Sequence, residues 1–261
     1  MSDSSYDINF LQRKNPHERD DRILFEEANH AYTIDDDADY TSVTTWIHTH
    51  FAAFDADSVI ANMRKSWKWG PDHKYFGMTD DEIKKAWDDN RDAAAAAGTA
   101  MHFNIECFFN GHEVSDNSVE FTYFRNFVSE LPDLTPYRTE WKIFHEELRI
   151  AGSVDMLFQK ADGSFAIYDW KRSREISKNG FNKFATTPCI KHIPDSNHWH
   201  YCLQLNIYKA ILEAKYDIKV SEMKIICLHP NNKNGNYQCI EIADLSDEVT
   251  SLFRMRSLEV S

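Results

Sequence analysis

No two cysteines lie close together in this 261-residue sequence. The five thiols are scattered, never in a C-x-x-C arrangement, at Cys107, Cys189, Cys202, Cys227 and Cys239. Zinc and iron–sulfur sites commonly use close cysteine pairs, and an odd, scattered set of thiols is typical of a reducing compartment. The sequence therefore predicts reduced thiols, no iron–sulfur cluster and a cytoplasmic location.

A long apolar run is also missing. The longest small-apolar stretch, Ala93 to Met101, is much shorter than the roughly 20 residues that span a bilayer. The chain starts with MSDSSYD, which has neither the basic nor the apolar segment of a secretion signal. We expect neither secretion nor a membrane partner.

Internal repeats and low-complexity linkers are absent as well, and 42% of the residues are apolar. A chain of this length and composition can bury a core of ordinary size. We expect a single packed domain, in which a hairpin and helical elaboration over residues 1–90 precedes the main fold over residues 91–261.

Basic residues are scarce relative to acids, with 29 against 42 and a formal net charge of 29 − 42 = −13. Such a balance argues against a polyanion as partner. The charge is uneven, however, because residues 1–40 hold eleven acids and four bases, whereas residues 170–194 hold six bases and one acid. That basic stretch is either a solvated loop or a nucleic-acid contact, and its bases are Lys171, Arg172, Arg174, Lys178, Lys183 and Lys191.

The N-terminal part combines strand and helix patterns. Residues 25–34 and 40–43, separated by the polar loop at residues 35–39, predict a hairpin, and residues 44–63 carry helical spacing.

The remainder has a regular succession of patterns. Thr79 followed by Glu82 is a capping box, which predicts a helix that continues to about Gly111. We then expect three strands, a helix, two strands and a terminal helix, with the strands at 140–144, 148–158, 165–170, 223–229 and 237–242 and the first of these helices at 198–216.

Asp169-Trp170-Lys171 sets a carboxylate beside an ammonium, because alternate residues of a strand share a face. The triplet alone carries little information. The chain holds seven D/E-x-K triplets, which are led by Asp72, Glu82, Glu140, Asp169, Glu213, Asp217 and Glu222.

Asp155, in the preceding strand, supplies the missing context. If Ala161-Asp162-Gly163 forms a three-residue loop with Gly163 left-handed, Asp155 lies directly opposite Asp169, with Cβ atoms roughly 5 Å apart. Opposed carboxylates are unfavourable unless a cation or a proton compensates them. A two-residue Asp-Gly turn would put them on opposite faces instead, so the turn type decides whether this pair can hold a hard cation.

Two further pairs have the four-residue spacing that shares a helix face. His102 and Glu106 lie at the edge of an apolar stripe, where an imidazole and a carboxylate suit a metal site. Gln204 and Tyr208 flank the apolar stripe of the late helix, where polar groups can hold a ligand or a neighbouring catalytic residue.

In this order and spacing, G-T-x-x-H-x-x-x-E, A-G-S-V-D, D-W-K and Q-x-x-x-Y resemble the motifs of the PD-(D/E)XK nuclease superfamily, specifically its RecB-type and phage-exonuclease-like branch. The resemblance spans residues 98–208. It implies an α/β (α+β) fold with a restriction-endonuclease-like core, in which helices flank a central mixed β-sheet. The N-terminal segment also resembles phage or large-virus members, for which the location would be the host cytosol or nucleus.

The resemblance also implies a role for each motif residue. Asp155 and Asp169 would be metal-binding carboxylates, with His102 as an additional ligand and the main-chain carbonyl of Trp170 completing the shell. Lys171 would orient or activate water.

The other motif positions have supporting roles. Glu106 would be an acid in or next to the metal shell, and Gln204 and Tyr208 match the late-helix motif. We expect Arg172, Arg174, Lys178, Lys183 and Lys191 to contact nucleic acid.

The expected activity is phosphodiester hydrolysis with Mg²⁺ or Mn²⁺, because carboxylates select hard divalent ions. We expect an exonuclease-like enzyme that acts on DNA in recombination, repair or genome processing. An RNA endonuclease and a non-catalytic nucleic-acid-binding protein of the same fold remain alternatives. The triplets His48-Thr49-His50 and His198-Trp199-His200 suggest a metal-dependent amide hydrolase, but that chemistry needs a strand end and both triplets lie in helical patterns.

Overall fold

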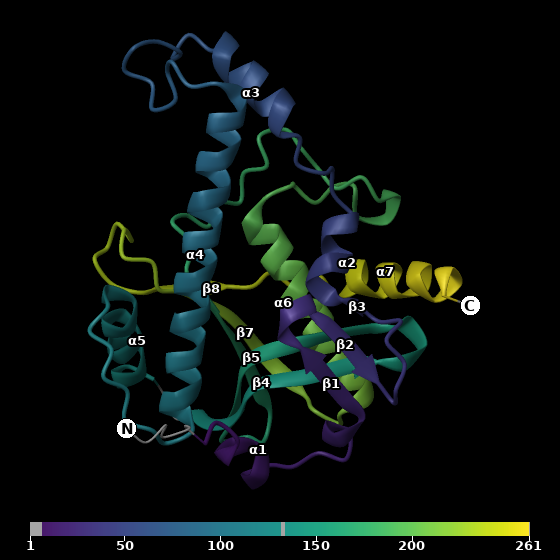
Figure 1. Ribbon diagram of the computed structural model, residues 1–261. Helices are drawn as coiled ribbons and strands as arrows, with labels where there is room; N and C mark the ends of the chain where they lie inside the picture. The colour runs from purple at the N-terminus through teal and green to yellow at the C-terminus, as the bar shows by residue number, and fades with distance from the viewer. Residues whose placement is uncertain (1–6, 132–133, 261) are drawn as a thin grey trace.

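A computed structural model describes residues 7–131 and 134–260. Within these residues the protein is an α/β structure with helices on both faces of a six-stranded mixed sheet (Figure 1). The strand order is β3-β5-β6-β7-β8, and β4 pairs with the other edge of β5. The strands of this sheet are β3 (Thr41–Ser42), β4 (Leu134–His145), β5 (Ile150–Lys160), β6 (Phe165–Lys171), β7 (Val220–Cys227) and β8 (Gln238–Glu241). The expected coarse fold class and the expected order of elements from residue 140 onward are confirmed.

The β5–β6 hairpin has the three-residue loop that the sequence favours. The amide of Lys160 donates to the carbonyl of Ser164 over 2.8 Å, and Gly163 has a φ of 81°. The pairing of Met156 with Tyr168 and of Phe158 with Ala166 follows from this turn. The expected register is therefore confirmed, and its next pair would be Asp155 with Asp169.

β5 and β6 separate at that next pair. The β5–β6 ladder ends at Met156 and Tyr168, while residues 150–151 of β5 pair in parallel with the short strand β3. β6 continues beside β7 as far as Lys171. Asp155 and Asp169 thus stand at a fork between two strands.

Helices cover the sheet on both faces. The first core lies between one face of the sheet and α2, α6 and α7, and it contains Trp141. The second core lies between the other face and α4 and α5, and it contains Trp170. The bounds are α2 (Val43–Thr49), α4 (Asp80–Phe109), α5 (Val119–Ser129), α6 (Asn197–Lys215) and α7 (Ser246–Glu259). None of the helices in the described residues is long and apolar enough to cross a membrane.

The expected N-terminal hairpin is wrong in its pairing. β1 (Ile23–Glu26) pairs with β2 (Ala31–Ile34), so the stretch taken as one strand contains a turn at Glu27–Asn29, followed by His30 with a left-handed φ of 49°. β3, the expected second strand, joins the main sheet instead.

The expected helix at residues 44–63 is interrupted. α2 ends at Thr49, and α3 (Ala56–Lys65) begins anew with the Asp55 side chain as its N-cap. α4 begins at the expected Thr79–Glu82 capping box and runs unbroken through residue 90. The division of the chain at that residue stays a prediction.

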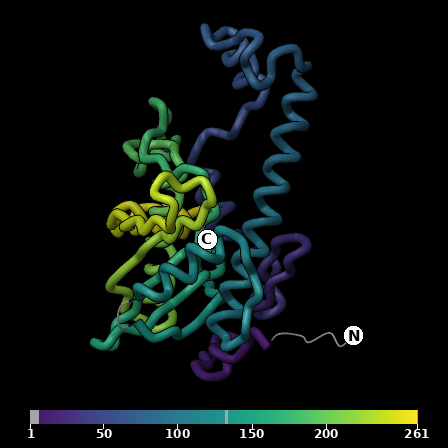
Figure 2. Tube along the Cα trace, turned by 90° about the vertical axis from the view of Figure 1, so that its left-hand side faces the viewer, coloured from purple at the N-terminus to yellow at the C-terminus, as the bar shows by residue number. Residues whose placement is uncertain are grey.

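α4 extends beyond the body of the protein (Figures 1 and 2). We define the arm as residues 56–92, which comprise α3, the segment 66–79 and the start of α4. Residues 91–96 of α4, which include four alanines, are exposed on every side, so tertiary packing does not stabilise this part of the helix. Alanine has the highest helix propensity, which accounts for a helix that persists without packing.

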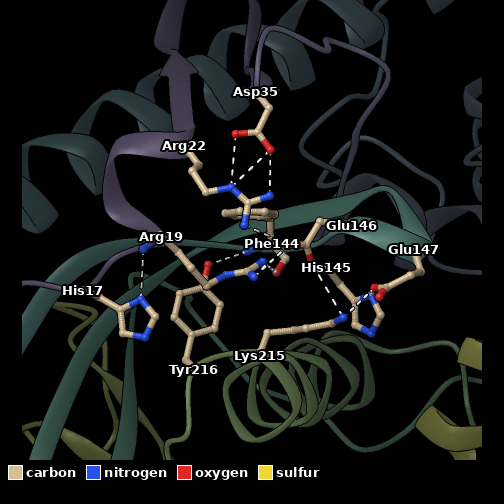
Figure 3. A network of polar contacts seen from close by, with 10 residues as sticks. All are labelled: His17, Arg19, Arg22, Asp35, Phe144, His145, Glu146, Glu147, Lys215 and Tyr216. Atoms are coloured by element: carbon tan, nitrogen blue, oxygen red, sulfur yellow. Dashed lines mark hydrogen bonds and ion pairs between the residues drawn. The ribbon is translucent and has the colours of Figure 1, made fainter.

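A charged network joins the N-terminal segment to the turn between β4 and β5 (Figure 3). Nη1 of the buried Arg19 lies 2.8 Å from Oε1 of Glu146, and its Nη2 donates to the carbonyl of Phe144 over 3.1 Å. Arg22 lies 3.2 Å from the same Glu146 oxygen and 2.7 Å from Asp35. The Lys215 ammonium on α6 lies 3.8 Å from the other Glu146 oxygen. Glu146 therefore holds three segments of the chain together.

We expect this network to make stability depend on acid pH. Burial acts to raise the pKa of Glu146, but Arg19 and Lys215 outweigh it and lower the pKa to about 2 from 4.5. A folded-state pKa below the unfolded value contributes stability above about pH 4.5, which is lost as the pH falls toward 2. Glu146→Gln should lower the free energy of unfolding by about 2 kcal/mol at pH 7 and by much less at pH 2.5, as measured by urea unfolding.

Glu147→Gln is the matched control, because this neighbouring carboxylate is 67% exposed and its ion pair with Lys215 is screened by water. An equal loss of stability in both variants at pH 7 would contradict the assigned role of Glu146.

Candidate metal centre

Three side chains from separate elements meet beside the fork. His102 of α4, Glu140 of β4 and Asp155 of β5 each offer one ligand atom, and these atoms all lie within 4.8 Å of one another. Nδ1 of His102 is 3.3 Å from Oε1 of Glu140 and 3.6 Å from Oδ2 of Asp155. Of the carboxylates expected from the sequence, Asp155 belongs to this cluster.

The main chain of Trp170 lies against the same cluster. Its N–H donates to Oδ2 of Asp155 over 3.0 Å, and its carbonyl accepts from Nε2 of His102 over 3.0 Å. The indole points the other way, into the second core against Phe124 and Phe127. The carbonyl expected as a metal ligand is therefore next to the expected imidazole.

Asp169 is held on the other side of the fork. Its Oδ2 lies 2.7 Å from the Lys171 ammonium, and the carboxylate is 2% exposed. Nε2 of Gln204 on α6 is 3.4 Å from Oδ1 of Asp169 and 3.3 Å from the Tyr208 hydroxyl. The four residues expected from the D-W-K and Q-x-x-x-Y motifs thus lie together, although Asp169 is outside the three-residue cluster.

Gly152 of the A-G-S-V-D motif makes room for this arrangement. A Cβ atom at residue 152 would lie 2.5 Å from Cε1 of Tyr208, closer than any real contact. Because Tyr208 is buried and cannot move outward, only glycine allows α6 to approach β5 this closely.

Glu140 was missed in the sequence reading. Its φ of 44° is left-handed within an otherwise extended strand, a conformation that costs about 1–2 kcal/mol for a residue with a side chain. His102 and the Ser153 hydroxyl, which donates to Oε2 over 2.9 Å, hold the carboxylate in place. The available signal was Glu140-Trp141-Lys142, a triplet with the same central tryptophan as Asp169-Trp170-Lys171.

Glu106 lies one helical turn after His102. It shares a cleft of about 550 Å³ with His102, Glu140 and Lys142. Burial, and then the charge of Glu140, raise the pKa of Glu106 to about 7. Its carboxyl group therefore changes protonation state near neutral pH while facing the cleft.

The fork holds more negative charge than its own cations balance. Burial and the neighbouring Asp169 raise the pKa of Asp155 to about 7. Burial acts to lower the pKa of His102, yet Asp155 and Glu140 outweigh it and raise the pKa to about 9. Burial likewise opposes the charge of Lys171, but Asp169 and Asp155 keep its pKa above the ordinary value. Above neutral pH, when Asp155 is ionised, protonated His102 and Lys171 face three carboxylates. A hard cation fits this donor set once His102 has lost its proton, because only a neutral imidazole is a metal ligand.

A second hollow opens on the far side of the fork. It measures about 380 Å³ and is lined by Lys171, Gln204, Thr44, Ile47, His48, Asn197, His200 and Tyr201. The rings of His48 and His200 lie 5.5 Å apart there, so the two H-x-H triplets meet, but both lie on helices as the sequence indicates. One hollow thus lies on the His102 side of the candidate centre and another on the Lys171 side, while the buried Asp155 and Asp169 line neither.

The basic stretch divides into two paired residues, Lys171 with Asp169 and Arg172 with Glu120, and four exposed ones. Nε of Arg172 donates to Oε1 of Glu120 on α5 over 2.7 Å, and this ion pair keeps the side chain at 20% exposure. The exposed residues are Arg174, Lys178, Lys183 and Lys191.

No family model matches this chain, and no curated protein matches it either.

Asp155→Asn tests the charge excess directly. The substitution keeps the shape of the side chain and an acceptor for the Trp170 N–H, but it removes a negative charge beside Asp169. We expect the free energy of unfolding at pH 8 without divalent metal to rise by about 1–2 kcal/mol, and the stabilisation of the wild-type protein by MnCl₂ to be lost. Urea and thermal unfolding with EDTA or MnCl₂ measure both effects.

Asp21→Asn, at an exposed acid, is the control and should change neither quantity. A variant at residue 155 that is less stable without metal, yet equally stabilised by manganese, would contradict the assignment.

Proposed function

We propose that the protein is a divalent-metal-dependent nuclease that hydrolyses phosphodiester bonds of DNA, with a restriction-endonuclease-like core. The observation that carries this proposal is the fork between β5 and β6. There the confirmed hairpin register leads to Asp155 and Asp169, with the Trp170 carbonyl, His102 and Lys171 within reach. Four motifs far apart in the sequence thereby contribute to one buried, acidic centre.

The residues that would hold the ion are His102, Glu140 and Asp155, together with the Trp170 carbonyl and Asp169. A bound Mg²⁺ or Mn²⁺ supplies neutralisation of charge on phosphate oxygens and a more acidic water. Glu140 extends the ligand set that the sequence resemblance implies. The hollow on each side of the fork leaves room for a strand that approaches the centre.

Lys171 acts in this proposal as a cation and a hydrogen-bond donor. Asp169 keeps the pKa of Lys171 above its ordinary value, so the side chain keeps its proton near neutral pH and does not act as a general base. It can orient a water molecule and stabilise negative charge on the phosphate. Gln204 and Tyr208 position Asp169, and through it they position Lys171.

Glu106 is the group suited to proton transfer. With a pKa of about 7, its carboxyl can hold a proton or release it at neutral pH, which is the property of an efficient acid or base. It opens on the cleft that also contains His102 and Glu140. In this proposal Glu106 therefore donates a proton to the leaving group, or accepts one from the attacking water, on the His102 side of the centre.

This function is tested by incubating the protein and MnCl₂ with labelled single-stranded DNA, double-stranded DNA or RNA. We expect cleavage of DNA that requires the metal and falls at least a hundredfold in Lys171→Ala, because the variant loses a donor aimed at the reacting phosphate. The control is Lys219→Ala, which removes an exposed lysine immediately before β7 and should leave the rate unchanged.

Metal-dependent cleavage of RNA alone would establish the RNA endonuclease instead. Binding without cleavage would indicate the non-catalytic alternative. Cleavage that survives in Lys171→Ala would contradict the assigned centre.

The imidazole in the ligand set predicts a preference among metals. Nitrogen ligands favour Mn²⁺ over the harder Mg²⁺, so we expect higher activity with manganese at matched concentration. His102→Asp, which offers oxygen in place of nitrogen, should reduce the ratio of the two rates. A wild-type rate that is equal or lower with manganese would count against His102 as a ligand.

A further inference from the structure

The tip of the arm differs in charge from the rest of this acidic chain. We define the arm tip as residues 64–76, a segment with four bases and one acid in a protein of net charge −13. Aromatic residues are interspersed with these charges, in the order R-K-S-W-K-W-G-P-D-H-K-Y-F.

Part of the arm tip is fixed by side-chain packing and hydrogen bonds. Trp69 packs against His73 with ring centroids 4.6 Å apart, and the Arg64 guanidinium lies 5.0 Å from the Trp69 ring. Arg64 is itself fixed, because its Nη2 contacts a carboxylate oxygen of Asp80 over 2.6 Å and the Met78 carbonyl over 2.9 Å. These contacts hold the segment against the start of α4.

Trp67 is left out of these contacts. Its exposed fraction is 89%, the highest among the exposed large apolar residues in the described part of the chain. The Lys68 ammonium lies 5.5 Å from the indole centroid. An aromatic face with a cation beside it is therefore presented to the surroundings.

The lysines of the arm tip are also available. Within residues 7–131 and 134–260, none of Lys65, Lys68 and Lys74 has an ion pair. Bases elsewhere on the arm are paired, as in Lys84 with Asp57 and Lys85 with Asp89. The positive charge of the arm that makes no ion pair thus lies within the arm tip, and the Lys68 part of it lies beside Trp67.

An exposed indole beside the Lys68 ammonium, in a segment with two further lysines that make no ion pair, matches the two chemical features of a single strand of nucleic acid. Unpaired bases stack on aromatic faces, and lysines neutralise the phosphates between them. The base faces of a duplex are stacked on one another, so a duplex could contact the lysines but could not stack on Trp67. The chemistry of the arm tip therefore favours a single strand over a duplex.

α4 aligns this surface with the candidate metal centre. It begins at Asp80, which Arg64 of the arm tip contacts, and it carries His102 further along. Figure 1 shows α4 running from the arm down to the sheet. Twenty-two residues at 1.5 Å each separate Asp80 from His102 by roughly 33 Å, which corresponds to about ten nucleotides at the 3.4 Å spacing of a stacked strand. The arm tip and the fork are therefore about one ten-nucleotide strand apart.

We propose that the arm tip binds a single strand of DNA, with a base stacked on Trp67 and phosphates contacted by Lys65, Lys68 and Lys74. The choice of DNA rests on the proposed function, but binding at the arm tip does not require catalysis. It is therefore measured on the full chain in EDTA.

Fluorescence anisotropy with a labelled 20-nucleotide oligo-dT tests the stacking contact. Trp67→Ala should weaken binding about tenfold, and Trp67→Phe should retain most of the affinity, because phenylalanine preserves an aromatic face. The matched control is Leu258→Ala, at an apolar residue of α7 that is 80% exposed, which should bind as the wild type does. Unchanged thermal unfolding in each variant shows that the fold is retained.

The salt dependence tests the lysines. Replacement of Lys65, Lys68 and Lys74 by alanine should reduce the slope of log affinity against log salt by about two, since each phosphate contact on a single strand contributes about 0.7. Lys219→Ala provides the control for loss of an exposed lysine.

Several results would overturn the proposal. One is equal affinity of Trp67→Ala and the wild type for oligo-dT, or tighter binding of a blunt duplex than of the single strand. Another is loss of binding in Phe181→Ala but not in Trp67→Ala, which would assign the strand to the basic stretch, where Phe181 is 80% exposed. Binding of phosphatidylserine vesicles or of a 20-nucleotide RNA, without binding of oligo-dT, would assign the surface to a membrane or to RNA.

The two proposals fail in different ways. If the nuclease proposal is wrong, metal-dependent cleavage is absent while binding that depends on Trp67 persists. If the arm-tip proposal is wrong, cleavage sensitive to Lys171→Ala persists while the Trp67 variants bind as the wild type does.

Discussion

The separation of β5 from β6 is the constraint on which the candidate centre depends. A three-residue turn closed by Gly163 sets the pairing of the two strands, and the ladder stops one pair short of Asp155 and Asp169. Main-chain groups of Trp170 are then bound by side chains, with Asp155 taking its N–H and His102 its carbonyl. Helices on opposite faces of the sheet can both reach the fork, so α4 contributes His102 and α6 contributes Gln204.

Charge is the feature that makes this fork a candidate metal centre. Glu140, on a left-handed residue of β4, and Asp155 meet at His102, and Asp169 lies close enough to Asp155 to raise its pKa. Protonated His102 and Lys171 balance part of the charge, and the carboxylates raise the pKa values of both groups in return. Burying like charges destabilises a fold, and a divalent ion would relieve that cost. The net charge of −13 is therefore compatible with a nucleic-acid substrate, because part of the acidity belongs to the centre itself.

α4 connects this centre to the arm. Its C-terminal part is anchored in the second core by Met101 and Ile105, while residues 91–96 are exposed and depend on the helix propensity of alanine. The helix therefore acts as an unsupported rod between a buried acidic centre and an exposed basic, aromatic tip. If both proposals hold, one helix positions a metal ligand and the surface that holds the strand.

Local patterns in the sequence determined much of this protein. The capping box at Thr79, the Gly163 turn and the period-two strands predicted the central elements and the β5–β6 register, because short-range backbone chemistry controls them. The N-terminal hairpin was wrong, since β3 pairs with a strand more than one hundred residues away and no local signal reports that. Glu140 was hidden among seven similar triplets, because its role depends on an unusual φ and on contact with His102 from another element. Only the tertiary structure decided which carboxylates meet, since that depends on how distant segments pack.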